Sequence, residues 1–229
     1  MALYAIGDLH LSLASNKPMD IFGDGWRDYV ERIREGFAQL NDEDVIVLCG
    51  DLSWGMSLEE SLEDFRFIHQ LPGTKLLLKG NHDYWWNTAT KMEKFFAQHE
   101  LTSLKILHNN CYFYGDQAIC GTRGWFYELD NQGTHNEKML AREAGRLEAS
   151  LQAAGEKEKL CFLHYPPLYQ GYQCPEILAV LQKYGVRQCF YGHLHGQSHR
   201  RAIEGEWNGT HFSLIAADYL KFIPKKICD

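Results

Sequence analysis

Short apolar runs recur along this chain, and polar residues follow each of them. Runs of this length, bounded by Gly or Pro, are typical of buried strands. They lie at residues 4–6, 45–49, 76–78, 160–163 and 189–191. The polar residues therefore come at the carboxyl ends of the predicted strands. In open α/β sheets this edge is where ligands bind.

In the segments that follow the first three predicted strands, apolar residues recur at helical spacing. We expect a helix capped by Asp24, a second helix opened by Ser57, and a third from about Thr88. Strands at 44–49 and 74–78 alternate with these helices. This alternation predicts a parallel sheet with crossover connections.

The pattern changes in the second half of the chain. Three short strand-like pieces within 104–121, separated by turn signals, predict antiparallel hairpins. A charged helix with one buried stripe is expected over 135–154. Pro175 opens a further helix at its first position, and strand 188–191 follows. Residues 200–215 are predicted to form antiparallel strands.

The composition is ordinary for a globular protein, with 229 residues, 45% of them hydrophobic and 23% charged. This length can bury a sizeable core and predicts a single domain over residues 1–229. The net charge of −7 argues against binding of long nucleic acids, which need a basic face. No apolar run approaches the length of a membrane span.

Localisation is predicted from two further observations. The first predicted strand begins within a few residues of Met1, so there is no room for a signal peptide. The seven cysteines are an odd number, and no two are spaced as Cys-x-x-Cys. We therefore expect a reduced, cytoplasmic compartment.

Asp, Asn and His gather at the predicted strand ends, and these side chains suit hard or borderline metal ions. The candidates are Asp8, His10, Asp51, Asn81, His164, His193 and His195. Asp51, on the central predicted strand, is well placed to bridge two ions. Two metals about 3.5–4 Å apart can clamp the attacking and leaving oxygens of an in-line phosphoryl displacement.

Five motifs in order along the chain resemble the signature of the calcineurin-like metallophosphoesterase superfamily. They are Gly7-Asp8-x-His10, Gly50-Asp51, Gly80-Asn81-His82-Asp83, His164 and Gly192-His193-x-His195. They span nearly the whole chain, and each follows a predicted strand. The resemblance implies an α/β fold, a four-layer α/β/β/α sandwich with mixed sheets, and a dinuclear metal site. Within the superfamily, the chain looks like the small bacterial phosphohydrolase branch.

The resemblance also implies a role for each residue of these motifs. A first metal would be held by Asp8, His10, Asp51 and His195, and a second by Asp51, Asn81, His164 and His193. Manganese and iron are the leading metals, and the ligand set would also accept zinc, cobalt or nickel. His82 would protonate the leaving oxygen, and Asp83 would support this region from behind the ligands.

These expectations together predict a metal-dependent phosphohydrolase, in which metal-bound hydroxide attacks a small phosphomonoester or phosphodiester. Phosphoprotein phosphatases carry a further acid and an arginine in the second motif, whereas this chain continues as Leu52-Ser53-Trp54-Gly55. One alternative is a cyclic-nucleotide phosphodiesterase or nuclease. Others are a non-catalytic scaffold with the same fold and a mononuclear metalloprotein.

Some residues near the motifs keep two interpretations each. Arg123 and Asn81 are predicted to contact the substrate, since a guanidinium matches phosphate oxygens, but a surface ion pair is as well supported for Arg123. Trp54 and residues 84–86 could line a pocket or simply pack against the sheet edge. Residues 13–20 could form a lid or a plain connecting loop.

Overall fold

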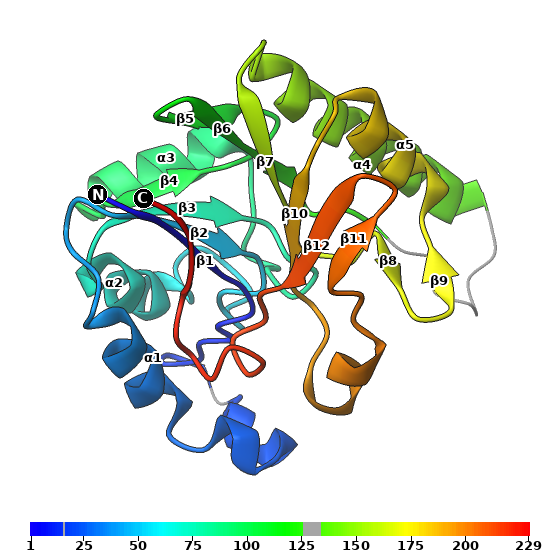
Figure 1. The fold of residues 1–229 in the computed structure, drawn as a ribbon. Helices are drawn as coiled ribbons and strands as arrows, with labels where there is room; N and C mark the ends of the chain where they lie inside the picture. Colours follow the sequence, from blue (N-terminus) through cyan, green and yellow to red (C-terminus); the bar gives the residue numbers. More distant parts are fainter. Residues whose placement is uncertain (16, 126–133) are drawn as a thin grey trace. The chain divides into compact units, whose positions relative to one another are not determined.

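The computed structural model describes the whole chain except residues 16 and 126–133, and the chain divides into two compact units. The first unit comprises Met1–Ile106 and Ile215–Asp229, and the second comprises Leu107–Leu214 (Figure 1). The expectation of a single domain over the whole chain stays a prediction.

A five-stranded sheet forms the centre of the first unit, in the order β13-β1-β2-β3-β4. Its strands are β1 (Leu3–Ile6), β2 (Val45–Cys49), β3 (Thr74–Leu78), β4 (Leu104–Ile106) and β13 (Lys225–Cys228). Strands β1 to β4 are parallel, which confirms the prediction from alternating strands and helices. Strand β13 pairs antiparallel with β1. The loops after β1, β2 and β3 therefore leave the same edge of the sheet.

Three helices pack on this sheet: α1 (Tyr29–Phe37), α2 (Leu62–Gln70) and α3 (Ala89–Gln98). Phe37, Phe65 and Met92, one from each helix, are fully buried in a core shared with the strands. Burying one such side chain stabilises the fold by about 1.5–3 kcal/mol. Helix α3 begins as predicted, because the Thr88 hydroxyl accepts a hydrogen bond from the Lys91 N–H at 3.3 Å.

The other two helices of the first unit begin later than predicted. Two short 3₁₀ helices precede α1, namely η1 (Met19–Phe22) and η2 (Asp24–Trp26). The prediction that Asp24 caps a longer helix is wrong, because the backbone of Arg27 is extended, with ψ of 132°, and ends the turn. Helix α1 therefore begins at Tyr29. After Ser57 the chain forms a turn before α2 begins at Leu62.

A six-stranded mixed sheet forms the centre of the second unit, in the order β11-β12-β10-β7-β6-β5. Its strands are β5 (Cys111–Tyr114), β6 (Gln117–Thr122), β7 (Glu158–Leu163), β10 (Gln188–Tyr191), β11 (Gly205–Trp207) and β12 (Thr210–Leu214). The four inner strands are parallel, and the two edge strands are antiparallel to their neighbours. A small hairpin of β8 (Leu168–Tyr169) and β9 (Tyr172–Gln173) and the 3₁₀ helix η3 (Gly196–Arg201) complete the unit.

Helices α4 (Thr134–Ala153) and α5 (Pro175–Lys183) lie side by side in the second unit (Figure 1). Helix α4 confirms the predicted helix to within one residue at each end. Leu140, Leu147 and Leu151 form its buried stripe, and Glu143 is buried with them. Helix α5 begins with Pro175, as predicted.

The predicted hairpins within 104–121 are half right. Strands β5 and β6 form a hairpin around Gly115, with Cys111 opposite Cys120. Strand β4 instead pairs parallel with β3, because Leu104 and Ile106 are buried in the first unit. Both units combine a mixed sheet with helices, which confirms the predicted α/β class with mixed sheets. Among the helices that the structure describes, none has the length and apolar character needed to cross a membrane.

Candidate metal centre

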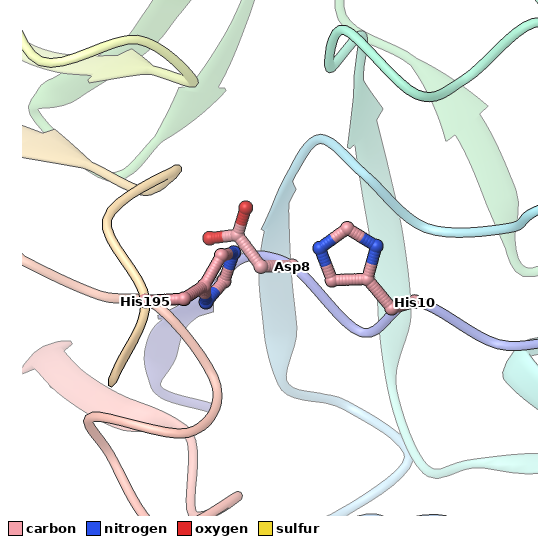
Figure 2. Close-up of side chains that lie close together, drawn as sticks. All are labelled: Asp8, His10 and His195. Carbon is pink, nitrogen blue, oxygen red and sulfur yellow. The ribbon is translucent and has the colours of Figure 1, made fainter. Parts of the chain in front are cut away.

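Asp8 and His10 lie on the loop after β1, on backbone that only a few non-glycine residues adopt. Their φ angles are 62° and 48°, in the left-handed region. Backbone hydrogen bonds hold this conformation: the Asp8 N–H donates to the Gly50 carbonyl at 2.8 Å, and the His10 N–H donates to the Asp51 carbonyl at 2.9 Å. Figure 2 shows both side chains on this loop, and a ligand atom of each lies within 4.8 Å of the other. Strained backbone of this kind is typical of functional sites.

Asp51, on the loop after β2, is held in one orientation. Its Oδ1 accepts a hydrogen bond from the His82 N–H at 2.7 Å, and its Oδ2 lies 3.8 Å from His10 Nε2. A Cβ on Gly80 would lie 2.0 Å from Oδ1 and 2.2 Å from the Asp51 nitrogen, so only glycine fits at position 80. The Gly80-Asn81-His82-Asp83 motif therefore positions the Asp51 carboxylate directly.

Asp83 is fully buried and joins the loops after β2 and β3. Its carboxylate accepts hydrogen bonds from Gly80 N (2.7 Å), Leu52 N (2.8 Å), Asp51 N (2.9 Å), Trp85 Nε1 (3.0 Å) and Ser53 N (3.4 Å). Burial raises the pKa of the Asp83 carboxyl, while the hydrogen bonds from the backbone lower it. This arrangement supports a positioning role from behind the candidate ligands.

Aromatic rings surround His10 and His82, the two histidines of the sequence motifs in the first unit. Trp54 stacks on His10 at 5.1 Å between ring centroids and lies 4.5 Å from the half-buried His82. Trp26 meets His10 edge-on at 5.7 Å. Trp85 is instead buried in the core, packed edge-on against Phe65 and donating to Asp83. The aromatic residues thus divide: Trp54 contacts the site, whereas Trp85 packs beneath it.

Asp64 is a residue that the sequence analysis missed. Its carboxylate accepts hydrogen bonds from the Leu13 N–H at 2.8 Å and from the Ser53 hydroxyl at 2.5 Å, and it is buried. Burial raises the pKa of this carboxyl. Asp64 thereby ties the segments after β1 and β2 to α2. Asp64 precedes Phe65 on α2, and no sequence motif around it predicts this role.

His164 follows β7, and His193 and His195 follow β10, in the second unit. A ligand nitrogen of His164 lies within 4.8 Å of one of His193, and their ring centroids are 5.1 Å apart. The ring of Tyr165 packs at 5.1 Å from His164 and at 4.6 Å from His193. The Gly192 N–H donates to the His164 carbonyl at 3.1 Å. His195, also labelled in Figure 2, extends from the loop after β10.

Arg123 lies in a partly buried ion pair, whose partner Glu143 is fully buried. Its Nη2 is 3.1 Å from Oε1 of Glu143, and the Arg123 side chain is only 13% exposed. Glu143 also accepts hydrogen bonds from Arg146 at 2.6 Å and from Thr122 at 2.7 Å. The Arg123 carbonyl accepts from the Tyr165 N–H at 2.8 Å, directly beside His164. The predicted contact between Arg123 and a substrate phosphate stays a prediction.

The order and placement of these residues agree with a comparison against protein families. The family model for calcineurin-like phosphoesterases matches residues 1–197. The chain belongs to this family. Membership supports metal-dependent hydrolysis of a phosphoester as the general chemistry of this phosphoesterase.

Solved structures share the fold of the phosphoesterase over almost its full length. The phosphopantetheinyl hydrolase of Mycobacterium tuberculosis is 12% identical, with a TM-score of 0.60 over 99% of this chain and 95% of that one. TT1561 of Thermus thermophilus is 13% identical, with a TM-score of 0.57 over 92% of this chain and 86% of that one. The protein of unknown function AQ665 from Aquifex aeolicus is 15% identical, with a TM-score of 0.55 over 98% and 95%. At these identities the likeness shows the fold alone, and no curated protein matches the chain.

The donor set of the phosphoesterase fits metal ions. Asp8 and Asp51 are almost completely buried, at 0% and 1% exposure, on loops that follow neighbouring strands. Burying carboxylates is costly unless cations or hydrogen bonds compensate their charge. Imidazole nitrogens accompany the carboxylates in the first unit and form the pair His164 and His193 in the second. Oxygen and nitrogen donors of this kind suit manganese, iron, zinc, cobalt and nickel.

Proposed function

We propose that this phosphoesterase hydrolyses a small phosphomonoester or phosphodiester with the help of two metal ions. The observation that carries the proposal is the Asp51 carboxylate, held by the His82 N–H with its other oxygen 3.8 Å from His10. The first ion would be held by Asp8, His10, Asp51 and His195, and the second by Asp51, Asn81, His164 and His193. We propose manganese or iron for both positions.

The bridging role falls to Asp51 because both of its oxygens have defined surroundings. Oδ1 faces the loop after β3, and Oδ2 faces His10. When bound, two such ions polarise the phosphoryl oxygens and lower the pKa of a water molecule. Asp83 keeps Asp51 in this orientation by accepting its backbone N–H, and it does not itself contact substrate in the proposed mechanism.

His82 is the proposed general acid. Its backbone is anchored to Asp51, and its ring lies 4.5 Å from Trp54 and 5.8 Å from His10. The residue is half-buried, so part of it is open to solvent. A histidine can give a proton to a leaving oxygen near neutral pH, since its ordinary pKa is about 6.5.

Arg123 and Asn81 are the proposed contacts to the substrate phosphate. Glu143 holds one Nη of Arg123, and the guanidinium lies over Trp125 at 4.8 Å, so its plane is fixed. A guanidinium has five N–H donors, and the Nε–H of Arg123 has no hydrogen-bond partner among the described residues. Glu143 would therefore orient Arg123 while leaving donors for an anion.

The test compares His82→Ala with wild type, using p-nitrophenyl phosphate and bis(p-nitrophenyl) phosphate with added manganese. The wild type should hydrolyse one ester class. The turnover rate of the variant should be about 10²–10⁴-fold lower than that of wild type, with larger losses for poorer leaving groups. His211→Ala, at a histidine with a half-exposed side chain on β12, should match wild type. Equal losses for good and poor leaving groups would rule out the general-acid role of His82.

A further inference from the structure

A cavity of about 380 Å³ lies in the second unit, and none of the described residues that line it belongs to the proposed metal centre. Its lining includes Tyr169, Gln170, Tyr172, Gln173, Ile203 and Trp207. Pockets for small ligands fall in this size range. We call this cavity the tyrosine groove.

The tyrosine groove is built on segments that continue from candidate ligands. The β8–β9 hairpin begins at Leu168, shortly after His164. Its Tyr169 pairs with Ala202, and the Gln170 N–H donates to the Arg201 carbonyl at 2.7 Å. Arg201 is the last residue of η3 and Ala202 follows it, and η3 itself follows His195 directly. Strand pairing therefore couples the groove to both ligand-bearing loops of this unit.

The distance along the chain keeps the groove close to the ligands. From His164 to Tyr169 the chain advances five residues, which span at most about 17 Å even when fully extended. The Tyr191 hydroxyl donates to the Ile203 carbonyl at 2.7 Å, and Tyr191 ends the strand that leads to His193. Tyr169 therefore lies no farther than about 17 Å from His164, so a ligand in the groove is held near the loop that carries this histidine.

The lining of the tyrosine groove selects the chemistry of its occupant. Tyr169 and Tyr172 stack at 5.0 Å with an interplanar angle of 23°, and Trp207 adds a third aromatic ring. None of the described residues that line the groove carries a charge, so it does not suit a phosphate or a charged peptide. Gln170 and Gln173 each offer an amide donor and acceptor. A flat, uncharged ring with hydrogen-bonding edges matches this combination.

We propose that the tyrosine groove binds the nucleobase of a nucleotide substrate. Bases stack on aromatic side chains whatever their identity, and a glutamine amide can pair with a base edge, adenine above all. The cleavage step rests on the proposed function: water adds to phosphorus, the P–O bond to the nucleoside breaks, and the nucleoside oxygen takes the proton. Binding of the base does not depend on that step.

Binding is tested with nucleosides, which carry no phosphate. Adenosine, guanosine, cytidine and uridine are titrated into the manganese-loaded protein. Binding is measured by calorimetry and by saturation-transfer NMR. At least one should bind to wild type, and Tyr172→Leu and Gln173→Leu should weaken its affinity about 5-fold or more. Phe113→Leu, at an aromatic residue 62% exposed on β5, and Gln182→Leu, at an exposed position on α5, should leave affinity unchanged. Absence of binding by all four nucleosides would overturn the proposal.

Hydrolysis then separates the groove from the metal chemistry. AMP is compared with ribose 5-phosphate, and a nucleoside p-nitrophenyl diester with methyl p-nitrophenyl phosphate. Wild type should prefer the nucleotide in kcat/KM, and Tyr172→Leu should reduce that preference by about 5-fold or more, whereas Phe113→Leu should keep it. Nucleoside binding without hydrolysis of any ester supports the groove and removes the proposed function. If the nucleotide ester and its base-free counterpart are hydrolysed equally and no nucleoside binds, the proposed role of the groove is overturned, while the proposed function is kept.

Discussion

In the first unit a buried carboxylate connects the loops that carry candidate ligands, whereas in the second unit ring packing holds the histidines. Asp83 accepts five hydrogen bonds there, four of them from backbone N–H groups. In the second unit Tyr165 lies against both His164 and His193, and one backbone hydrogen bond joins Gly192 to His164. One carboxylate thus joins the ligand-bearing loops in the first unit, whereas ring contacts accompany backbone hydrogen bonds in the second.

This difference has a physical consequence for mutations. Hydrogen bonds to a buried charge are strong and leave several backbone donors unsatisfied when they are lost. Aromatic contacts contribute less each, about 0.5–1.5 kcal/mol beyond burial, and neighbouring rings can adjust. Mutations behind the ligands should thus reduce folding stability most in the first unit, and metal affinity more selectively in the second.

The largest effect is expected for Asp83→Asn. The asparagine amide would turn an N–H₂ towards backbone N–H donors, so some of them lose their acceptor. We expect the free energy of unfolding, measured with urea, to fall by about 3 kcal/mol. Asp24→Asn removes a carboxylate that is 94% exposed and should change it by less than about 0.5 kcal/mol. A loss below about 1 kcal/mol for Asp83→Asn would contradict the account of the first unit.

An intermediate effect is expected for Tyr165→Leu. Removing the ring frees His164 and His193 to move, so manganese affinity, measured by titration, should fall by about 10-fold, the scale seen when support behind metal ligands is lost. Tyr165→Phe keeps the ring and should retain the wild-type affinity. If the phenylalanine variant lost as much affinity as the leucine variant, the hydroxyl rather than ring packing would position the histidines.

The smallest effect concerns Lys75, a buried charge of the first unit that no candidate ligand contacts. Its Nζ donates to the carbonyls of Leu71 at 2.5 Å and Gly73 at 2.7 Å, and burial lowers its pKa to about 8. Since the unfolded chain keeps this proton up to about pH 10.4, the unfolded state binds more protons between the two values. The contribution of Lys75 to stability should therefore rise as pH increases from about 8 to about 10, and this gain should be lost as pH is lowered back to about 8.

The measurement for Lys75 is the urea unfolding free energy at pH 7.5 and pH 9.5. Wild type should gain stability relative to Lys75→Met between these values, by on the order of 1 kcal/mol. Lys91→Met, at an exposed lysine in α3, should follow wild type. A difference between wild type and Lys75→Met that stays constant with pH would show that the pKa of Lys75 is not lowered.

Most of the strands that carry candidate ligands could be predicted from local sequence. Strands β2, β3 and β10 are short apolar runs. The bounds of β3 and β10 agree with the prediction, and β2 begins one residue later than predicted. The signal is strong because buried parallel strands are apolar on both faces. The positions of Asp8, Asp51 and His164 just after strands follow from the same pattern.

Other features depend on contacts between distant parts of the chain. Strand β13 contains Lys225 and Lys226, so it has no apolar pattern, and pairing with β1 alone makes it a strand. Strand β4 joins β3 rather than a hairpin because Ile106 is buried with the first core. The hydrogen bonds of Asp64 could not be predicted, since the direction of a backbone N–H is not encoded by residue type.

The central claim, a dinuclear centre bridged by Asp51, is tested most directly by metal content. Wild type and Asp51→Asn are loaded with manganese, freed of excess by gel filtration and analysed for metal per chain, with Asp116→Asn at an exposed carboxylate as control. We predict about two ions per chain in wild type and in the control, and at most about one in Asp51→Asn. Two ions retained by Asp51→Asn, or a wild type that holds none, would contradict the account.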